Sequence, residues 1–301
     1  MPDEIVLAAD ETPKKLENFL KKRYPIGYIR KLFRKSGIRL NGKHPKPGDL
    51  IQAGDRILFY IPFETGAPPP RSGKAVTGIE IIFDDDSLLV IDKLAGLAVQ
   101  EGRTVAKRDS VLGILESRYW GKGVTPKLVH RLDKDTSGLL LVAKEQETAD
   151  QLESLFETRQ VEKVYLCLLV GRLPQNEGTI DLPLPGRDGI PARAVTRFKV
   201  EKRFSDTTLA RVMIETGRMH QIRLHFARLG YPVVMDDQHG DFTFNKRFRK
   251  QYGLKRQFLH AASLTLDYGG KRRTWTSPLP KDLAATLRSL EGKQGGFKKR
   301  E

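Results

Sequence analysis

HRLDKDTSG, residues 130–138, runs directly into LLLVAK, residues 139–144. The first part crowds a histidine, an arginine and two aspartates into a loop that ends in a turn signal, and the second part predicts a hydrophobic strand. A scaffold does not need this concentration of charge, whereas reaction centres are often built on loops beside rigid strands. A purely structural interpretation also exists, because an aspartate followed by Thr-Ser-Gly commonly shapes a turn. The rest of the chain has to distinguish these two interpretations.

Composition limits the class of protein and the kind of partner. The chain has 301 residues, 39% hydrophobic and 30% charged, which suits a soluble protein with one large domain and one small one. The 53 Lys and Arg residues outnumber the 37 Asp and Glu residues, giving a formal net charge of +16. This excess predicts a polyanionic partner, with nucleic acid as the leading candidate. The alternative is a basic surface that serves only solubility.

The single cysteine, Cys167, excludes an intrachain disulfide framework and a cysteine-based zinc site. The first residues contain acids and lack the apolar segment of a signal peptide. A run of about 18 apolar residues, the length that predicts a membrane span, is also missing from the sequence. We therefore expect a protein of the reducing cytoplasm.

Residues 1–62 indicate a small module. Apolar residues at helical spacing predict one helix around Leu16 and a second between Pro25 and Gly37, with Gly37 as its C-terminal cap. Strands are expected at residues 38–40 and 56–61, and Asn41-Gly42 is a strong tight-turn signal.

Charge in this module is one-sided. Ten Lys or Arg residues and no acidic residue lie between Lys21 and Lys46. Such a face on an amphipathic helix suits contacts with a phosphate backbone. A membrane-surface helix is the alternative, but the module needs the apolar face for its own core. The residues that we predict to contact RNA here are Arg30, Lys31, Arg34, Lys35, Arg39 and Lys43.

The remainder of the chain divides into three parts. Residues 63–77 are rich in Pro and Gly and predict a flexible linker. Residues 78–290 predict a large α+β domain, and residues 291–301 a basic disordered tail. Within the large domain, strands are expected at residues 79–83, 88–92, 163–170, 194–200, 209–216, 258–266 and 273–280, and helices at 145–160, 218–229 and 281–290. Alternation in the strand at 163–170 puts Tyr165 on the face opposite an aliphatic row, where it could look into a cleft.

Several kinds of site have no support in the sequence. His220 and His225 are five residues apart, so they point in different directions on a helix or a strand, and the other histidines have no metal-binding spacing. Phosphate-loop and dinucleotide-binding fingerprints are missing, and Ser137 lacks the strand and elbow of a serine nucleophile. A carboxylate is the remaining candidate for chemistry.

Four blocks, in order, resemble the RluA-type pseudouridine synthase family. They are KLAGLAV at 93–99, HRLDKDTSG at 130–138, KVYLCLLVG at 163–171 and TGRMHQIRLH at 216–225. In the N-terminal module, LENFL at 16–20, IRLNGK at 38–43 and AGDR at 53–56 resemble the RNA-binding domain of the ribosomal-protein-S-four type, with Lys15 where that domain usually has Arg. The two resemblances together span nearly the whole chain.

The resemblance implies a mixed, mainly antiparallel central sheet flanked by helices and loops, beside the small α/β RNA-binding domain. It also implies an isomerase that converts uridine in RNA to pseudouridine and needs no cofactor and no metal. By resemblance, Asp133 is the nucleophile, Arg223 its ion-pair partner and Tyr165 the ring that packs against uracil. Whether Asp133 attacks C1′, attacks C6 or assists loss of the 2′ proton stays open. The residues Arg131, His130, Arg218 and His220 are expected to contact RNA near the site, and His130 is expected above all to hold the loop.

The target is suggested by YPVVMDDQHGD at 231–241, which is similar to a branch of the family that modifies large-subunit ribosomal RNA. We expect a monomer acting on that RNA. The alternatives are the same activity on another RNA such as tRNA, a non-catalytic RNA-binding ribosome-assembly factor, and a nucleic-acid hydrolase. The chain departs from the family pattern at Leu94, Gln100, Met219 and His239, and these departures bear on substrate contacts.

Overall fold

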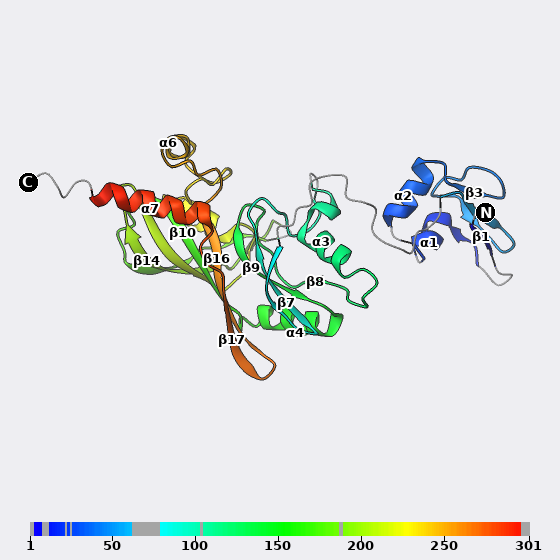
Figure 1. The fold of residues 1–301 in the computed structure, drawn as a ribbon, viewed down its shortest axis with the longest axis horizontal. Helices are drawn as coiled ribbons and strands as arrows, with labels where there is room; N and C mark the ends of the chain where they lie inside the picture. The colour runs from blue at the N-terminus through cyan, green and yellow to red at the C-terminus, as the bar shows by residue number, and fades with distance from the viewer. Residues whose placement is uncertain are drawn as a thin grey trace, which may run out of the picture. The chain divides into compact units, whose positions relative to one another are not determined.

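The structure is a computed structural model that describes residues 3–7, 12–21, 23–24, 26–61, 79–102, 105–186 and 189–295. The chain divides into two compact units, Met1–Pro69 and Pro70–Glu301, whose elements are labelled in Figure 1. The linker predicted at 63–77 and the last six residues of the predicted tail lie outside the described residues.

The described residues of the smaller unit form two helices and five short strands. Both predicted helices are present, as α1, Leu16–Lys21, and α2, Ile26–Arg34. The strands are β1 (Asp3–Val6), β2 (Lys14–Lys15), β3 (Ile38–Leu40), β4 (Leu50–Ile51) and β5 (Arg56–Phe59). They form an antiparallel sheet in the order β1-β5-β3 and a separate β2-β4 pair. Their apolar side chains and those of the two helices share one core.

The end of α2 differs in detail from its prediction. The left-handed residue that stops the helix is Ser36, with φ 51°, and Gly37 follows it, donating its N–H to the Leu32 carbonyl at 2.8 Å. A Cβ at position 37 would overlap the Ile61 side chain, so a larger residue there would require that side chain to move. The predicted Asn41-Gly42 turn is confirmed, since both residues have positive φ, 50° and 80°.

The larger unit is built on one ten-stranded sheet, in the order β11-β14-β15-β10-β16-β9-β7-β6, with β17 paired to β16 and β8 to β9. All its strand pairs are antiparallel except the short β9–β16 pair, so the expected mixed, mainly antiparallel sheet is confirmed. The sheet strands are β6 (Ile79–Asp84), β7 (Leu88–Lys93), β8 (Lys127–Leu128), β9 (Ser137–Ala143), β10 (Glu162–Val170), β11 (Glu177–Asp181), β14 (Val195–Arg203), β15 (Thr207–Ile214), β16 (Leu259–Tyr268) and β17 (Lys271–Thr276), and β12 (Leu184–Pro185) pairs separately with β13 (Pro191–Ala192).

Helices cover both faces of the sheet (Figure 1). They are η1 (Lys107–Asp109), α3 (Val111–Arg118), α4 (Gln146–Glu157), α5 (Gln221–Arg228), α6 (Phe242–Tyr252) and α7 (Lys281–Gly295). Side chains of α3 and α5 join the core on one face of the sheet. Side chains of α4 join a second cluster, and those of α6 and α7 join a third. These two clusters contain the strand residues that alternate with those of the first core. Strand β9 is therefore buried along its whole length, which explains its unbroken hydrophobic sequence.

Three predictions for this unit need correction, and two of its helices were missed. The helix expected from residue 218 begins at Gln221, because His220 adopts a left-handed conformation with φ 54°. The last helix continues to Gly295, so residues 291–295 are helical rather than disordered. Helices α3 and α6 were not predicted. Tyr165 does not lie on a non-core face, since it belongs to the main hydrophobic cluster and is only 7% exposed. Within the described ranges, no helix has the length and apolar character needed to cross a membrane.

Candidate active site

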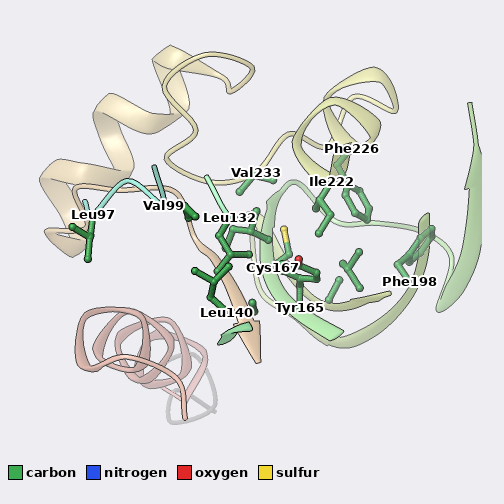
Figure 2. Close-up of a cluster of buried hydrophobic side chains, with 14 of the residues drawn as sticks. Leu97, Val99, Leu132, Leu140, Tyr165, Cys167, Phe198, Ile222, Phe226 and Val233 are labelled. Atoms are coloured by element: carbon green, nitrogen blue, oxygen red, sulfur yellow. The ribbon is translucent and has the colours of Figure 1, made fainter. Parts of the chain in front are cut away.

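The loop at residues 130–138 is anchored in the core by its leucine. Leu132, next to Asp133, is 5% exposed and belongs to the cluster that also contains Tyr165 and Cys167, as Figure 2 shows. The N–H of Thr136 donates to the Asp133 carbonyl at 3.1 Å, which closes a turn directly after the aspartate. Because a buried neighbour fixes its backbone, Asp133 is presented from a rigid position although its side chain is 20% exposed.

The end of the loop is fastened to strand β16 and to the segment before it. Gly138 has φ 111° and lies so close to Ala261 that a Cβ would collide with the Ala261 carbonyl oxygen, so only glycine fits. The Gln257 amide donates to Thr136 Oγ1 at 2.7 Å, and Arg256 Nη1 reaches the Asp135 carbonyl at 3.4 Å. The Thr-Ser-Gly run therefore serves to shape and attach the turn.

Lys93, at the end of β7, holds the other side of the loop. Its fully buried ammonium group donates to three backbone carbonyls, those of Leu94 at 3.0 Å, Leu97 at 2.9 Å and Lys134 at 3.0 Å. Burial lowers the pKa of Lys93 to about 7, and the nearby carboxylates of Asp135 and Asp133 oppose that shift. One lysine thus ties two loops together, and sequence analysis did not single it out.

Arg223 forms the expected ion pair with Asp133. Its Nη1 lies 3.1 Å from Asp133 Oδ2, although 90 residues separate the two in the chain. Helix α5 carries Arg223 and has its apolar residues Ile222 and Phe226 in the core, which fixes the direction of the guanidinium group. The side chain of Arg223 is only 4% exposed, so its charge needs buried partners.

The main partner of Arg223 is Asp236, which sequence analysis noted only as part of a double aspartate. Arg223 Nε and Nη2 donate to the two Asp236 oxygens at 2.6 and 2.7 Å, a bidentate pair. Burial alone would raise the pKa of Asp236, but the hydrogen bonds from Arg223 and from the N–H groups of His239 and Gln238 lower it overall. The neighbouring Asp237 is 73% exposed and only 3.5 Å from Arg223 Nη2.

Tyr165 lies near Asp133 on strand β10, beside a register shift between Val164 and Tyr165. Burial raises the pKa of its phenol, and the Asp133 carboxylate raises it further. The ring is therefore a neutral phenol at neutral pH. The three residues expected to carry chemistry, Asp133, Tyr165 and Arg223, are brought together by the fold.

Two histidines complete the rim of the site. His220 Nε2 lies 3.8 Å from Asp133 Oδ1, and His220 Nδ1 lies 3.1 Å from His239 Nε2. His239, one of the departures from the family pattern, therefore borders the site. Met219 is 66% exposed, and Arg218 is exposed with its Nε donating to the Arg193 carbonyl at 3.2 Å.

The two residues before Leu132 have different environments. Arg131 is exposed. His130 instead accepts a hydrogen bond from the Leu141 N–H at 2.9 Å and lies against the Phe156 ring, with centroids 4.7 Å apart. Burial lowers the pKa of His130 to about 3, and Lys163 adds to the effect. His130 thus holds the loop as a neutral ring, and its expected contact with RNA stays a prediction. In the part of the chain that the structure describes, no cluster of three or more His, Cys, Asp or Glu side chains could hold a metal ion.

The bidentate pair predicts a contrast between adjacent aspartates. Asp236→Asn should lower the free energy of unfolding of the larger unit by about 3 kcal/mol, because it leaves the buried Arg223 charge poorly compensated. Asp237→Asn should change it by less than about 0.5 kcal/mol, since that side chain is exposed. Denaturant unfolding of both variants checks this, and equal losses would contradict the assignment of Asp236 as the main partner.

Lys93 predicts a pH dependence of stability. Its pKa is about 7 in the folded chain and near its ordinary value of 10.5 when unfolded, so between these values the unfolded chain binds the extra proton. The free energy of unfolding should therefore rise with pH, by up to about 1.4 kcal/mol per pH unit. The Lys93→Met variant has no titratable side chain at this position, so it lacks this contribution to the pH dependence. The difference in unfolding free energy between wild type and Lys93→Met should shift in favour of wild type from pH 7 to pH 9, and a constant difference would refute the shifted pKa.

Comparison with known proteins agrees with this geometry. Residues 87–228 match the sequence profile of the family described as RNA pseudouridylate synthase. The ribosomal large subunit pseudouridine synthase C of Salmonella typhimurium is 33% identical over 93% of each chain, and that of Escherichia coli K12 is 32% identical over 92% of each chain.

Solved structures show the same fold. Human RNA pseudouridylate synthase domain containing 4 superposes with a TM-score of 0.61 and 26% identity, over 70% of this chain and 93% of that one. Human RNA pseudouridylate synthase domain containing 1 has a TM-score of 0.58 and covers 76% of this chain and 98% of its own. The loop, strand and helix blocks that resemble this family in sequence lie together around one carboxylate in the structure. This chain belongs to the RluA-type family of pseudouridine synthases, isomerases that convert uridine in RNA to pseudouridine.

Proposed function

We propose that this protein converts specific uridines of large-subunit ribosomal RNA to pseudouridine, with Asp133 as its catalytic carboxylate. The observation that carries the proposal is the contact of 3.1 Å between Asp133 and the buried Arg223. Asp133 lies on a loop that Leu132 and Lys93 fix in place. The target follows from the relatives, which are named for the large ribosomal subunit and align over more than nine tenths of both chains.

The reaction keeps all atoms of the nucleotide. The N1–C1′ bond breaks, the uracil turns, a C5–C1′ bond forms, and the proton of C5 is lost while N1 gains one. Because the base must first leave its stack, the site has to receive an extruded nucleotide. A carboxylate suits attack at C1′, attack at C6 or assistance to loss of the 2′ proton, and each route needs Asp133 beside the ribose and base.

The neighbours of Asp133 have separate tasks. Arg223 orients the carboxylate and balances its charge. Tyr165 supplies a flat neutral ring against which uracil packs, and its raised pKa favours this role over that of a phenolate base. Arg131 and Arg218 are exposed cations at the rim that can meet phosphate, and His220 extends this rim toward the carboxylate.

Substitution of the carboxylate tests the activity. Asp133→Asn should lower pseudouridine formation by at least about 10³-fold, because it removes the carboxylate that every one of these routes needs while preserving size. Binding of the unmodified rRNA transcript should change little. Carbodiimide mapping of large-subunit rRNA and tRNA, with wild type and variant, measures product and identifies the target. Full turnover by Asp133→Asn would refute the role of Asp133, product in tRNA alone would refute the target, and RNA binding by a wild-type protein that makes no product would favour a non-catalytic assembly factor.

We further propose that residues 1–62 form an RNA-binding domain of the S-four type. Its helix α2 buries Ile29 and Leu32 and exposes Arg30, Lys31 and Arg34, and Lys35, directly after the helix, is exposed as well. Among the described residues, no carboxylate forms an ion pair with these four cations, whereas Lys21 pairs with Glu17 and Arg56 with Glu4. Arg39 and Lys43 extend the same basic sequence through β3 and its turn.

The salt dependence of RNA affinity tests this module within the full chain. Replacing the four cations Arg30, Lys31, Arg34 and Lys35 with Gln should reduce the slope of log Kd against log salt concentration by about 3. Each lost phosphate contact lowers that slope by roughly 0.7. The double variant Lys21→Gln, Arg56→Gln removes cations that are already paired and should leave the slope unchanged. An unaltered slope in the quadruple variant would exclude α2 from the interface.

Asp133, Tyr165 and Arg223 come from a single chain, which supports a monomer as the active unit. We place the reaction in the cytoplasm because the proposed substrate is ribosomal RNA.

A further inference from the structure

Helix α6 is bound rigidly to the segment that positions Arg223. The Asn245 side chain accepts from the Met235 N–H and donates to the Asp236 carbonyl, both at 2.8 Å. Asp241 caps the helix by accepting from the Phe244 N–H at 2.9 Å. Phe244 and Phe248 are buried in a core cluster with residues of β10 and α7. The outer face of α6 therefore keeps a fixed position relative to Asp236 and so to the site.

The outer face of α6 carries Phe242, Lys246, Arg249 and Lys250, which we call the α6 basic face. Their spacing of i, i+4, i+7 and i+8 puts them on one side of the helix. All four side chains are exposed, Phe242 by 64%. They line a hollow that also contains Asp236 and Asp237. The hollow thus joins the α6 basic face to the two aspartates that contact Arg223.

The charge of this face is not neutralised. Between Asp241 and Asp267 the sequence has six Lys or Arg residues and no acid. In the described part of the chain, Lys246, Arg249 and Lys250 form no ion pair, whereas exposed cations elsewhere on this unit do, such as Arg211 with Glu201 and Lys202 with Glu291. Unpaired cations beside an exposed aromatic ring fit a single nucleic-acid strand, since cations meet phosphates and the ring stacks on a base of any sequence.

We propose that the α6 basic face holds the RNA strand that flanks the target uridine, with Lys246, Arg249 and Lys250 on its phosphates and Phe242 stacked on a base. This inference rests on the proposed function for its substrate class. Asp237 is the exposed acidic side chain of the hollow, and it lies 3.5 Å from Arg223 Nη2. Because a carboxylate repels phosphate, the phosphates lie along Lys246, Arg249 and Lys250, away from Asp237. The strand enters along α6, and the extruded uridine is then presented to Asp133.

Charge removal on α6, in the full-length protein, tests the inference. The probe is an unmodified transcript of large-subunit rRNA, and Kd is measured at several salt concentrations. The triple variant Lys246→Gln, Arg249→Gln, Lys250→Gln should lower the slope of log Kd against log salt by about 2, at roughly 0.7 per phosphate on a single strand. The swap Lys246→Arg, Arg249→Lys, Lys250→Arg keeps the charges and should keep the slope.

A matched control removes three cations from strands β14 and β15. Lys199→Gln, Lys202→Gln, Arg211→Gln causes the same loss of net charge away from the hollow, and the slope should stay at the wild-type value. Phe242→Ala should raise Kd by about 5- to 100-fold without altering the slope, because stacking is not ionic. Thermal unfolding of each variant checks that the fold is retained.

The outcomes separate the inference from the proposed function. A wild-type slope in the α6 triple variant, or an equal fall in the control, overturns the inference even if the wild type forms pseudouridine normally. A wild type that forms no pseudouridine overturns the proposed function, and the salt slopes still report whether RNA lies on α6. Loss of slope in the α6 variant alone, together with weaker binding by Phe242→Ala, supports the inference.

Discussion

The site depends on one buried guanidinium group shared by two carboxylates. Arg223 has almost no contact with solvent, and an uncompensated charge in such a place would be strongly destabilising. Asp236 accepts hydrogen bonds from Nε and Nη2 of Arg223 in a bidentate pair, which leaves Nη1 to donate to Asp133. The geometry of Asp133 is therefore set by an interaction in which it is the secondary partner. Asp236, which never needs to touch RNA, determines where the arginine points.

The surrounding structure limits the freedom of the aspartate from every other side. Leu132 fills a position in the hydrophobic cluster, and Lys93 joins the loop backbone to the turn that follows β7. Arg256 reaches the same loop from before β16, while its other nitrogens bind Asp282 in α7. A side chain held by contacts from distant parts of the chain is preorganised, so the proposed role of Asp133 requires little further ordering.

Local patterns were enough to predict much of this arrangement. The strand at 163–170, the helix at 218–229 and the Asn-Gly turn all rest on short-range physics, and the motif blocks selected Asp133 and Arg223, which form an ion pair in the structure. The parts that sequence could not supply depend on tertiary contacts. Nothing in the residues around Lys93 shows that its ammonium group meets a carbonyl 41 positions later.

Other errors have the same origin. Helix α6 has only two phenylalanines on its buried side amid basic residues, so its pattern is weak until the core that it covers is known. Tyr165 was placed on an open face because alternation predicts which residues share a side of a strand and not whether helices cover that side. The burial that lowers the pKa of His130 is likewise invisible in a sequence.

The parallel contact between β9 and β16 has a consequence for the order of events in the cell. It consists of the pairs Ser137 with His260 and Gly138 with Ala261, so the turn that presents Asp133 is completed by residues made more than 120 positions later. During synthesis the N-terminal module emerges first and can fold while the turn still lacks its neighbour. The turn that carries Asp133 therefore cannot be completed on a partly synthesised chain, and it assembles only when the final strands have left the ribosome.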